Sequence, residues 1–361
     1  MAERSEDSYM WQAIDLARQP LFAPHPNPRV GCVIVVDGQV VAEGLHRAAG
    51  TDHAEVAALK VERDLKGGTL YVTLEPCATH GRTPPCSTRI LSSGISRVVI
   101  ASPDPNPVNG GLGIKQLREA GIQTEVGMLA DDARALNRGF FSRYERGRPW
   151  VTVKIAATLD GRVATANGES QWISGEAARA DVQLLRAQAS AVLTGVGTVL
   201  ADDPRLNCRM DGLQRQPLRV IVDSHLRTPK TATLFTVEGD ILFATGGKVE
   251  SESLPTSESQ SRIVSFESAD GRVDCRKLLD YLSELEVNDV LVEAGPTLVG
   301  EILDAGLVDE MVIYLAPAIL GDSAKAMVIT SVINRLTDRY RGKFEDVRFV
   351  GDDIRIQLLL S

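Results

Sequence analysis

The sequence is organised around Thr51-Asp52-His53-Ala54-Glu55 and two cysteine-bearing turns, Leu74-Glu75-Pro76-Cys77 and Thr83-Pro84-Pro85-Cys86. One imidazole and two thiols form a soft set of three ligands that suits Zn²⁺. Three protein ligands leave a fourth tetrahedral position for water, which is typical of a catalytic zinc site rather than a structural one. We therefore predict a zinc site at His53, Cys77 and Cys86.

Glu55 lies two residues beyond the histidine, where a carboxylate can move protons beside the metal without binding it. Bound zinc lowers the pKa of water to about 7, so a nucleophile becomes available at neutral pH. A general acid–base carboxylate next to such a site is the outline of a zinc hydrolytic deaminase. We predict that Glu55 is the catalytic proton shuttle.

A structural zinc site is the main alternative. Such a site normally has a fourth Cys or His at short spacing, and His80 is the nearby candidate. The usual deaminase signature also has two residues between its cysteines, whereas eight separate Cys77 from Cys86. The motif is thus a variant of that signature. Cys86 follows two prolines and is expected to begin a helix, whose dipole favours the thiolate.

Length and composition indicate a globular protein of two domains. The chain has 361 residues, of which 43% are hydrophobic and 24% charged. A net charge of -9 argues against a nucleic-acid partner, because it repels polyanions. The five cysteines do not form an even disulfide framework, and no apolar stretch is long enough for a leader or a membrane span. We expect a cytoplasmic enzyme that acts on a small molecule, without nucleic acid or membrane.

The first half alternates helix and strand patterns. Apolar residues at helical spacing predict a first helix capped by Ser8, and Asp37-Gly38 predicts a hairpin. Strands are expected over four β-rich runs: 31–36, 39–42, 69–73 and 97–101. These elements predict an α/β domain.

Two asparagines and a glycine cluster have open roles. Asn27 and Asn106 each lie between prolines, and they could offer amides to a pyrimidine or a ribose, or simply form turns. Glycines at 110, 111 and 113 resemble a dinucleotide fingerprint only loosely, since Gln116 replaces its last glycine. A substrate-facing loop and an ordinary turn are both open for this cluster.

A charged segment with Gly and Pro at 144–149 predicts a linker that divides the chain into domains 1–146 and 147–361. In the second domain, Ser174 is expected to cap a helix. Strands are expected at 151–157, 218–222, 241–244 and 290–293. Because these strands alternate with helical stretches, we predict a mainly parallel sheet.

The stretch from Glu293 to Gly300 is expected to form a strand–turn–helix junction. Free N–H groups at such a helix start bind phosphate, and Pro296 suits the first turn. The same residues fit an ordinary glycine-rich turn. Neither this turn nor Gly195-Val196-Gly197 completes a Rossmann fingerprint, so a dinucleotide bound here requires a different fold.

Taken together, the motifs resemble the bifunctional deaminase/reductase family of riboflavin biosynthesis over nearly the whole chain. The matching segments are His25-Pro26-Asn27-Pro28, Val30-Gly31-Cys32, His53-Ala54-Glu55-Val56, Thr73-Leu74-Glu75-Pro76-Cys77, Gly81-Arg82-Thr83-Pro84-Pro85-Cys86, Asp104-Pro105-Asn106-Pro107, Gly168-Glu169-Ser170-Gln171-Trp172-Ile173, Thr198-Val199-Leu200-Ala201-Asp202-Asp203-Pro204 and Val292-Glu293-Ala294-Gly295-Pro296-Thr297-Leu298. No single segment is specific, but the combination is.

The resemblance implies an α/β protein with an N-terminal, three-layer cytidine-deaminase-like domain and a C-terminal dihydrofolate-reductase-like domain. It implies that 2,5-diamino-6-ribosylamino-4(3H)-pyrimidinone 5′-phosphate loses its 2-amino group at the zinc site. NADPH then reduces the ribosyl group to ribityl by hydride delivery to C1′, which gives 5-amino-6-ribitylamino-uracil 5′-phosphate. The implied cofactors are Zn²⁺ and NADPH, and we expect a homo-oligomer.

The resemblance also implies roles for individual residues. The zinc ligands are His53, Cys77 and Cys86, with Glu55 as proton shuttle. The implied NADPH-binding positions are Ala156, Trp172, Thr198, Asp202, Ser224, Gly295, Pro296, Thr297, Leu298, Val299, Gly300 and Glu301. The implied substrate-binding positions are Ser170, Arg186, Leu206, Arg209 and Glu293. Some have a structural interpretation as well: Trp172 and Leu206 as core, Arg186 as a solvated helix face, and Asp202 as a turn former.

Ala57 and Ala78 depart from the family pattern, in which His and Ser are frequent, but neither is an expected ligand. Lys154 and Asp202 are expected near strand ends, where they could assist proton transfer to the opened sugar. Two other functions are open: a nucleic-acid base deaminase, which shares the zinc core, and a deaminase fused to a non-catalytic sensing domain. NADPH oxidation separates the bifunctional enzyme from the sensing-domain alternative, and RNA binding would favour the nucleic-acid deaminase.

Overall fold

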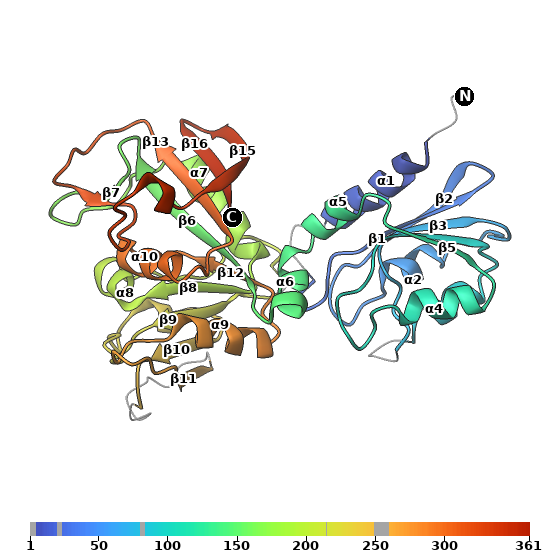
Figure 1. Ribbon diagram of the computed structural model, residues 1–361, viewed down its shortest axis with the longest axis horizontal. Coiled ribbons are helices and arrows are strands. Elements are labelled where there is room, and N and C mark those ends of the chain that lie inside the picture. Colours follow the sequence, from blue (N-terminus) through green and yellow to red (C-terminus); the bar gives the residue numbers. More distant parts are fainter. Residues whose placement is uncertain (1–4, 20–23, 80–83, 214, 249–259) are drawn as a thin grey trace. The chain divides into compact units, whose positions relative to one another are not determined.

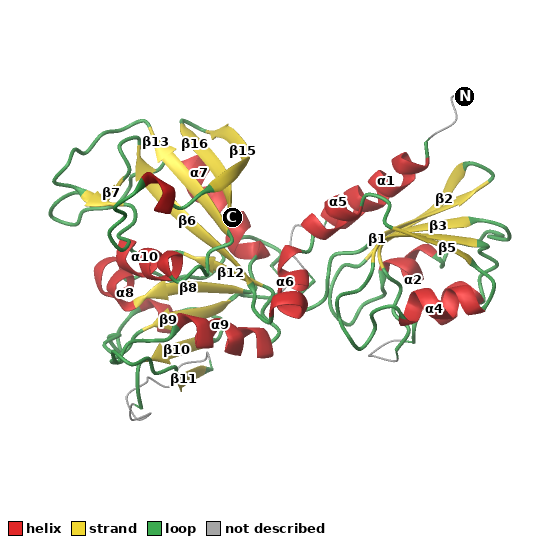
Figure 2. Ribbon diagram, in the orientation of Figure 1, coloured by secondary structure: helices red, strands yellow, loops and turns green. Residues whose placement is uncertain are grey.

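The computed structural model describes residues 5–19, 24–79, 84–213, 215–248 and 260–361. It divides into two compact units, Met1–Gly147 and Arg148–Ser361, each built on one main β-sheet with helices on its faces (Figure 1, Figure 2). His80 and the start of the motif at 81–83 lie outside the described residues. Within the described ranges, no helix is long and apolar enough to cross a membrane.

The first unit is a five-stranded sheet in the order β2-β1-β3-β4-β5. β1 pairs antiparallel with β2 and β3, whereas β3, β4 and β5 are parallel. The strands are β1 (Gly31–Val36), β2 (Gln39–Leu45), β3 (Thr69–Leu74), β4 (Arg97–Ser102) and β5 (Gln123–Val126). The helices are α1 (Glu6–Arg18), α2 (Ala54–Ala58), α3 (Cys86–Leu91), α4 (Leu112–Glu119), α5 (Ala130–Ala135) and α6 (Arg138–Arg146). The predicted hairpin, strands and helix start at Cys86 are confirmed.

Alternate residues of β1 face opposite sides of this sheet. Val33 and Val35 pack in the cluster with α1 and α5, and Cys32 and Ile34 pack in the cluster with α2, α3 and α4. α1 lies so close to β1 that a Cβ on Gly31 would come 1.9 Å from a carbonyl oxygen of that helix. The unit therefore has three layers, with α2 and α3 on the same face.

Ser8 is not the helix cap that the sequence predicts. α1 begins at Glu6, after Ser5, and the Ser8 hydroxyl donates to the Ser5 carbonyl at 2.6 Å. Glu6 and Asp7 lie in the first turn, where the helix dipole favours negative charge. These acidic residues explain why the helix begins earlier than predicted.

The second unit has a nine-stranded sheet in the order β11-β10-β9-β8-β12-β6-β13-β16-β15. Seven strands, from β11 to β13, are parallel, and β16 and β15 are antiparallel at one edge. Its nine strands are β6 (Trp150–Thr158), β8 (Ala191–Gly195), β9 (Leu218–Val222), β10 (Ile241–Thr245), β11 (Ser261–Ser265), β12 (Asp289–Val292), β13 (Glu310–Ala316), β15 (Gly342–Val350) and β16 (Asp353–Leu360). A separate antiparallel pair consists of β7 (Arg162–Ala164) and β14 (Lys325–Ala326). The prediction of a mainly parallel sheet is confirmed.

Helices cover both faces of this sheet. The helices are α7 (Glu176–Gln188), α8 (Val196–Asp202), α9 (Cys275–Glu284) and α10 (Pro296–Asp304), with short 3₁₀ turns η1 (Thr233–Thr236) and η3 (Leu336–Asp338). α9 and α10 enclose the largest core cluster, and α7 and α8 contribute to clusters built on the alternate strand residues.

Ser174 is a second cap prediction that is wrong. α7 begins at Glu176 after Gly175, whose N–H donates to the Asp353 carboxylate at 2.8 Å. Asp353 begins β16, so the cap of this helix comes from a part of the chain that local sequence patterns cannot indicate.

Candidate functional site

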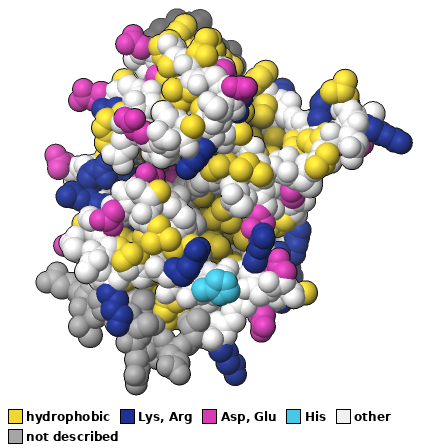
Figure 3. Space-filling view, turned by 90° about the vertical axis from the view of Figure 1, so that its left-hand side faces the viewer, with side chains coloured by type: hydrophobic (Ala, Val, Ile, Leu, Met, Phe, Trp, Pro, Cys, Tyr) yellow, Lys and Arg dark blue, Asp and Glu magenta, His cyan; other side chains and the backbone are white. Residues whose placement is uncertain are grey.

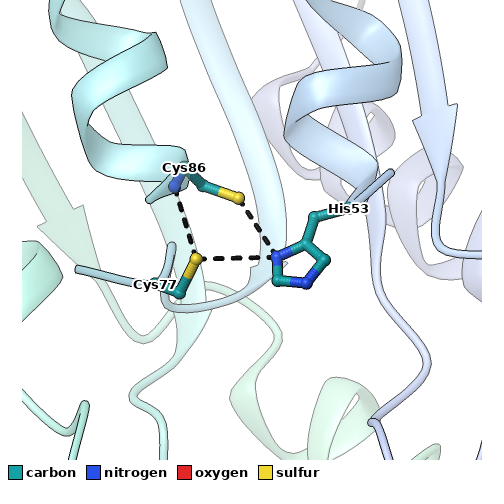
Figure 4. A group of neighbouring side chains, drawn as sticks. All are labelled: His53, Cys77 and Cys86. Carbon is teal, nitrogen blue, oxygen red and sulfur yellow. Dashed lines mark hydrogen bonds between the residues drawn. The ribbon is translucent and has the colours of Figure 1, made fainter. Parts of the chain in front are cut away.

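The three predicted zinc ligands come together in the first unit. His53 Nδ1, Cys77 Sγ and Cys86 Sγ lie within 4.8 Å of one another (Figure 4). The Nδ1 atom is 3.2 Å from Cys86 Sγ and 3.5 Å from Cys77 Sγ. Bonds of about 2.0–2.3 Å to one tetrahedral ion separate its ligands by roughly 3.3–3.8 Å. The donor set and its spacing therefore fit zinc.

Three element ends position these ligands. His53 is the N-cap residue of α2, Cys77 comes shortly after β3, and Cys86 is the first residue of α3. The Cys86 N–H donates to Cys77 Sγ at 3.3 Å. Free N–H groups and helix dipoles at such ends stabilise thiolates.

Glu75 holds the turn that carries Cys77. Its carboxylate, 4% exposed, accepts hydrogen bonds of 3.0–3.1 Å from the backbone N–H groups of Asp104, Gly111 and Ile114. A Cβ on Gly113 would lie 2.0 Å from the Pro76 carbonyl oxygen. The glycine cluster thus forms the start of α4 and allows its close approach to the cysteine turn, as an ordinary turn does.

The two thiols stabilise a single negative charge. Hydrogen bonds from Cys86 and His53 lower the pKa of the Cys77 thiol to about 4. The hydrogen bond to Cys77, together with burial, raises the pKa of Cys86 far above its ordinary value. A divalent cation is the group that would ionise both thiols at neutral pH.

Glu55 lies on α2 beside this cluster and is 3% exposed. Burial raises the pKa of its carboxyl to about 7, and the charge of Cys77 adds to the shift. A carboxyl with a pKa near neutrality can both accept and release a proton. The geometry is thus compatible with proton transfer at the ligand cluster.

His46 is a residue that the sequence analysis missed. It is 3% exposed, and its ring centroid lies 5.2 Å from that of His53. Its Nδ1 lies 3.0 Å from the Asp52 carbonyl oxygen, and its Nε2 lies 3.0 Å from Asn27 Nδ2. A ring protonated at Nδ1 and accepting at Nε2 directs the Asn27 amide oxygen away from His46. Burial lowers the pKa of His46, which favours this neutral form.

Asn106, by contrast, has a turn-forming role. Its Oδ1 accepts the Val108 N–H at 3.0 Å, and its own N–H donates to Asp104 at 2.9 Å. The neighbouring Asn109 is 4% exposed and accepts the Ala78 N–H at 2.7 Å. This loop supports the residues that follow Cys77.

In the second unit, Arg186 and Glu293 form an ion pair whose side chains are 11% and 12% exposed. The guanidinium donates to both carboxylate oxygens, at 2.5 and 2.9 Å, and to the Asn207 carbonyl at 3.0 Å. Burial opposes ionisation of Glu293, but Arg186 outweighs it and holds the pKa of the carboxyl below its ordinary value. Arg186 is therefore not a solvated helix residue.

Two further basic groups lie within electrostatic reach of this pair. Burial lowers the pKa of Lys154, while Glu293 opposes that shift. Burial and the charges of Arg186 and Arg205 lower the pKa of Arg209. Positive charge therefore exceeds negative charge around Glu293.

Several predicted cofactor positions follow the carboxyl ends of parallel strands. Thr198 follows β8, Ser224 follows β9, and Gly295 follows β12. A Cβ on Gly295 would lie 3.9 Å from Thr198 Oγ1, and one on Gly195 would lie 3.2 Å from Leu298. The starts of α8 and α10 thus lie side by side at the edge where α/β folds bind ligands.

Some of the predicted binding residues lie in the hydrophobic core or serve packing instead of facing an open site. Leu206 is 2% exposed and Val299 is 1% exposed, each within a core cluster, as the structural interpretation of Leu206 expects. A Cβ on Gly300 would lie 1.6 Å from the Ile329 carbonyl oxygen, so this glycine serves packing. Ala156 lies on β6, and Glu301 lies 3.9 Å from Arg272.

Trp172 is 70% exposed, so it is not a core residue, and its ring lies 4.7 Å from the Arg179 guanidinium. Ser170 Oγ donates to the Asp202 carboxylate at 3.3 Å. This contact brings one predicted substrate position next to one predicted cofactor position.

Both units match known families. A family model for the cytidine and deoxycytidylate deaminase zinc-binding region matches residues 3–102, and one for the RibD C-terminal domain matches residues 149–354. The chain is 42% identical to the riboflavin biosynthesis protein RibD of Escherichia coli, over 98% of this chain and 99% of that protein. The chain belongs to the RibD family. The predicted family and fold class are thereby confirmed.

Solved RibD structures agree over the full length. Acinetobacter baumannii RibD is 41% identical with a TM-score of 0.90, and the match covers 98% of each chain. A deaminase/reductase from Thermotoga maritima is 34% identical with a TM-score of 0.87, again over 98% of each chain. With both RibD domains present, the chain is a bifunctional deaminase and reductase of riboflavin biosynthesis.

Proposed function

We propose that the first unit hydrolyses the 2-amino group from 2,5-diamino-6-ribosylamino-4(3H)-pyrimidinone 5′-phosphate, and that the second unit reduces the ribosyl group to ribityl. The product is 5-amino-6-ribitylamino-uracil 5′-phosphate. The name of the Thermotoga maritima relative describes a deaminase and reductase of such pyrimidines. The observation that carries the proposal is the convergence of His53, Cys77 and Cys86 beside the buried carboxylate of Glu55.

In the first unit, we assign zinc to His53, Cys77 and Cys86. Zinc held there supplies Lewis acidity and an activated water at neutral pH. Glu55 takes a first proton from the attacking water and gives it to the ring nitrogen. It then takes the second proton from the added hydroxyl group and gives it to the amino group, which leaves as ammonia. Burial of Glu55 limits proton exchange with bulk solvent. We assign recognition of the pyrimidine or the ribose to the Asn27 amide, which contacts His46.

In the second unit, we assign the sugar phosphate to the basic region around Arg186, Arg205 and Arg209. Guanidinium groups bind phosphate oxygens in a planar, two-pronged geometry, and an anion there relieves the mutual repulsion of the arginines. Glu293 holds Arg186 in place through two hydrogen bonds. Because the Leu206 side chain is buried, its contact with substrate would come from the main chain.

We assign NADPH to the adjacent starts of α8 and α10. NADPH supplies the hydride for C1′ of the opened sugar. The backbone N–H groups of Gly295 and Thr297, on either side of Pro296 at the start of α10, suit phosphate oxygens, and Thr198 lies next to that turn. Trp172 offers an exposed ring surface for the cofactor to contact.

Proton transfer to the opened sugar is assigned to Lys154 or Asp202. Desolvation and the charge of Arg186 lower the pKa of Lys154, which favours release of a proton. Asp202 contacts Ser170. A Lys154→Met or Asp202→Asn variant that reduces substrate at the full rate would remove the corresponding residue from this role.

We further propose that the protein acts in the cytoplasm as a homo-oligomer. All five cysteines are free, and thiol ligands for zinc suit a reducing compartment.

The reaction order is tested by supplying the diaminopyrimidinone substrate to the zinc-loaded protein with and without NADPH. Without NADPH, we expect one ammonia per substrate and accumulation of the deaminated ribosyl compound. With NADPH, we expect the ribityl product and one NADPH oxidised per product. Formation of a reduced product that still carries the 2-amino group would contradict the proposed order.

A further inference from the structure

Residues 203–209, here called the arginine loop, follow the end of α8 and carry two of the arginines assigned above to the sugar phosphate. Arg205 and Arg209 are exposed, whereas Leu206 and Cys208 between them are 2% and 3% exposed. Lys and Arg side chains are dispersed over the face of the molecule that Figure 3 shows, so exposure by itself does not distinguish these two. The way in which the backbone of their loop is held does distinguish them.

The arginine loop contains two residues with a left-handed backbone. The φ angle is 42° at Asp203 and 57° at Leu206. Residues with a Cβ disfavour this conformation, which persists where the surrounding structure over-determines it. The Leu206 side chain packs in a core cluster, and the Asp203 carboxylate accepts from the Thr233 N–H at 2.7 Å. Contacts from outside the loop therefore fix its shape.

Gln216 binds the backbone of Cys208 as a paired strand residue would. Its Oε1 accepts from the Cys208 N–H at 2.9 Å, and its Nε2 donates to the Cys208 carbonyl at 2.9 Å. Two residues that face each other in an antiparallel pair exchange the same two kinds of bond. Gln216 comes two residues before β9, and Arg219 of β9 donates to the Arg205 carbonyl at 3.5 Å. These bonds tie the loop to the start of β9.

α7 holds the neighbouring residues of the loop. Gln183 and Arg186 are three positions apart on α7 and therefore lie on the same side of the helix. Gln183 Oε1 accepts from the Arg209 N–H at 2.9 Å, and Arg186 donates to the Asn207 carbonyl at 3.0 Å. Because Arg186 also pairs with Glu293, the ion pair and the arginine loop form one connected network.

We propose that Gln183 and Gln216 are positioning residues of the reductase site, which hold the backbone of residues 208–209 so that the Arg209 guanidinium is in place before the substrate phosphate binds. The inference rests on the assignment of the sugar phosphate to this basic region. Ordering a loop and a long side chain during binding lowers affinity, and a backbone that is fixed in advance removes the loop's part of that loss. Both glutamines act through Arg209 and carry no charge of their own.

The test compares reduction of the deaminated substrate with and without its 5′-phosphate by the full-length, zinc-loaded protein. Gln216→Met removes both bonds to Cys208, and Gln183→Met removes the bond to Arg209. For the phosphorylated compound, KM should rise about 10-fold in Gln216→Met and about threefold in Gln183→Met, with kcat within about twofold, because one hydrogen bond contributes roughly a factor of 3 to 10. KM for the compound without phosphate should be unchanged, because it lacks the group that Arg209 binds.

Two further variants complete the comparison. Gln260→Met makes the same substitution at an exposed glutamine of the second unit and should leave the KM of both compounds unchanged. Arg209→Met should raise the KM of the phosphorylated compound alone, and by more than either glutamine variant, because it removes the guanidinium itself. If Arg209→Met affects both compounds equally, the assignment of the sugar phosphate is wrong, and the inference that rests on it is wrong as well.

Two results would overturn the inference while the phosphate assignment stands. In the first, Arg209→Met affects only the phosphorylated compound, but neither glutamine variant changes its KM. In the second, the glutamine variants raise the KM of both compounds equally, which is the result expected if they only support the fold. If Gln216→Met fails to fold by circular dichroism, Gln183→Met, which loses a single hydrogen bond, decides between these outcomes.

Discussion

The two units handle charge in opposite ways at their candidate sites. In the first unit, one histidine and two cysteines within 33 residues of each other converge, and their thiols stabilise only one negative charge by themselves. In the second unit, Arg186 and Glu293 are 107 residues apart and neutralise each other through two hydrogen bonds. The first site therefore requires a cation for full ionisation, whereas the ion pair of the second is complete without one. Metal loss and charge substitution should consequently affect the units differently.

The largest effect is expected from Cys86→Ala. This variant loses a ligand that also hydrogen-bonds Cys77, so we expect loss of bound zinc and of all detectable ammonia release. Metal content by mass spectrometry and an ammonia assay measure both. Reduction of already deaminated substrate should remain. A parallel loss of reduction would contradict the independence of the two units.

Glu293→Gln should produce the next effect, in the second unit. It leaves Arg186 buried without its partner, which costs about 3–5 kcal/mol in the free energy of unfolding. Glu125→Gln is the matched control, since Glu125 pairs with Arg97 at 2.9 Å but its side chain is 44% exposed. We expect the control to cost less than about 1 kcal/mol. Urea unfolding of both variants gives the comparison, and equal costs would contradict it.

The effect of Glu293→Gln should also depend on pH. Arg186 holds the pKa of Glu293 below its ordinary 4.5 in the folded protein. The carboxylate therefore stabilises the fold above pH 4.5, and this contribution is lost as the pH falls through the lower folded value. The stability difference between the unaltered protein and the variant should shrink below pH 4.5. A stability difference between the two proteins that increases as the pH falls would contradict this prediction.

Gly113→Ala should have a smaller effect, confined to the first unit. The added Cβ would lie 2.0 Å from the Pro76 carbonyl oxygen and displace the turn before Cys77. Overpacking of this kind costs about 1–3 kcal/mol. Competition with a chelator should show that the Gly113→Ala variant binds zinc more weakly. Gly127→Ala is the control, because a Cβ on Gly127 meets no atom within 4 Å, so this variant adds a methyl group at a left-handed glycine without a clash. Equal zinc affinity in both variants would remove the packing argument.

The smallest effect is expected from Asp274→Ala. The Asp274 carboxylate caps α9 by accepting from the N–H groups of Arg276 and Lys277. Loss of such a cap costs about 1 kcal/mol. Thermal unfolding should show this decrease while both catalytic rates stay unchanged, and a change in either rate would link α9 to a site.

How far the sequence predicts these sites depends on the kind of interaction. The candidate metal cluster is predictable because soft metals require particular side chains at element ends, and His53, Cys77 and Cys86 satisfy that requirement locally. His46 is not predictable, because its role arises from contacts with Asn27 and Asp52 that only the fold creates. The contact between Asp353 and the start of α7 is likewise created only by the fold, and for this reason the cap prediction at Ser174 is wrong.

The candidate site of the second unit is harder to predict from the sequence, because much of it consists of backbone groups. Backbone N–H groups at a helix start have no sequence signature of their own, so the Gly295 turn fits both a phosphate site and an ordinary turn. Leu206 is a second example. A leucine side chain favours the core, and the side chain of Leu206 lies there. A substrate contact made by its backbone could not be predicted from the residue type.

We expect two independent active sites that act in sequence, and the Glu55→Gln variant separates them. NADPH oxidation would be measured with the zinc-loaded variant, given either the diaminopyrimidinone substrate or the already deaminated compound. With the first substrate, we expect a loss of about 10²–10⁴-fold, the usual contribution of a general acid–base group; with the second, oxidation should proceed at the rate of the unaltered protein. Equal oxidation of both substrates, or loss with both, would contradict the account.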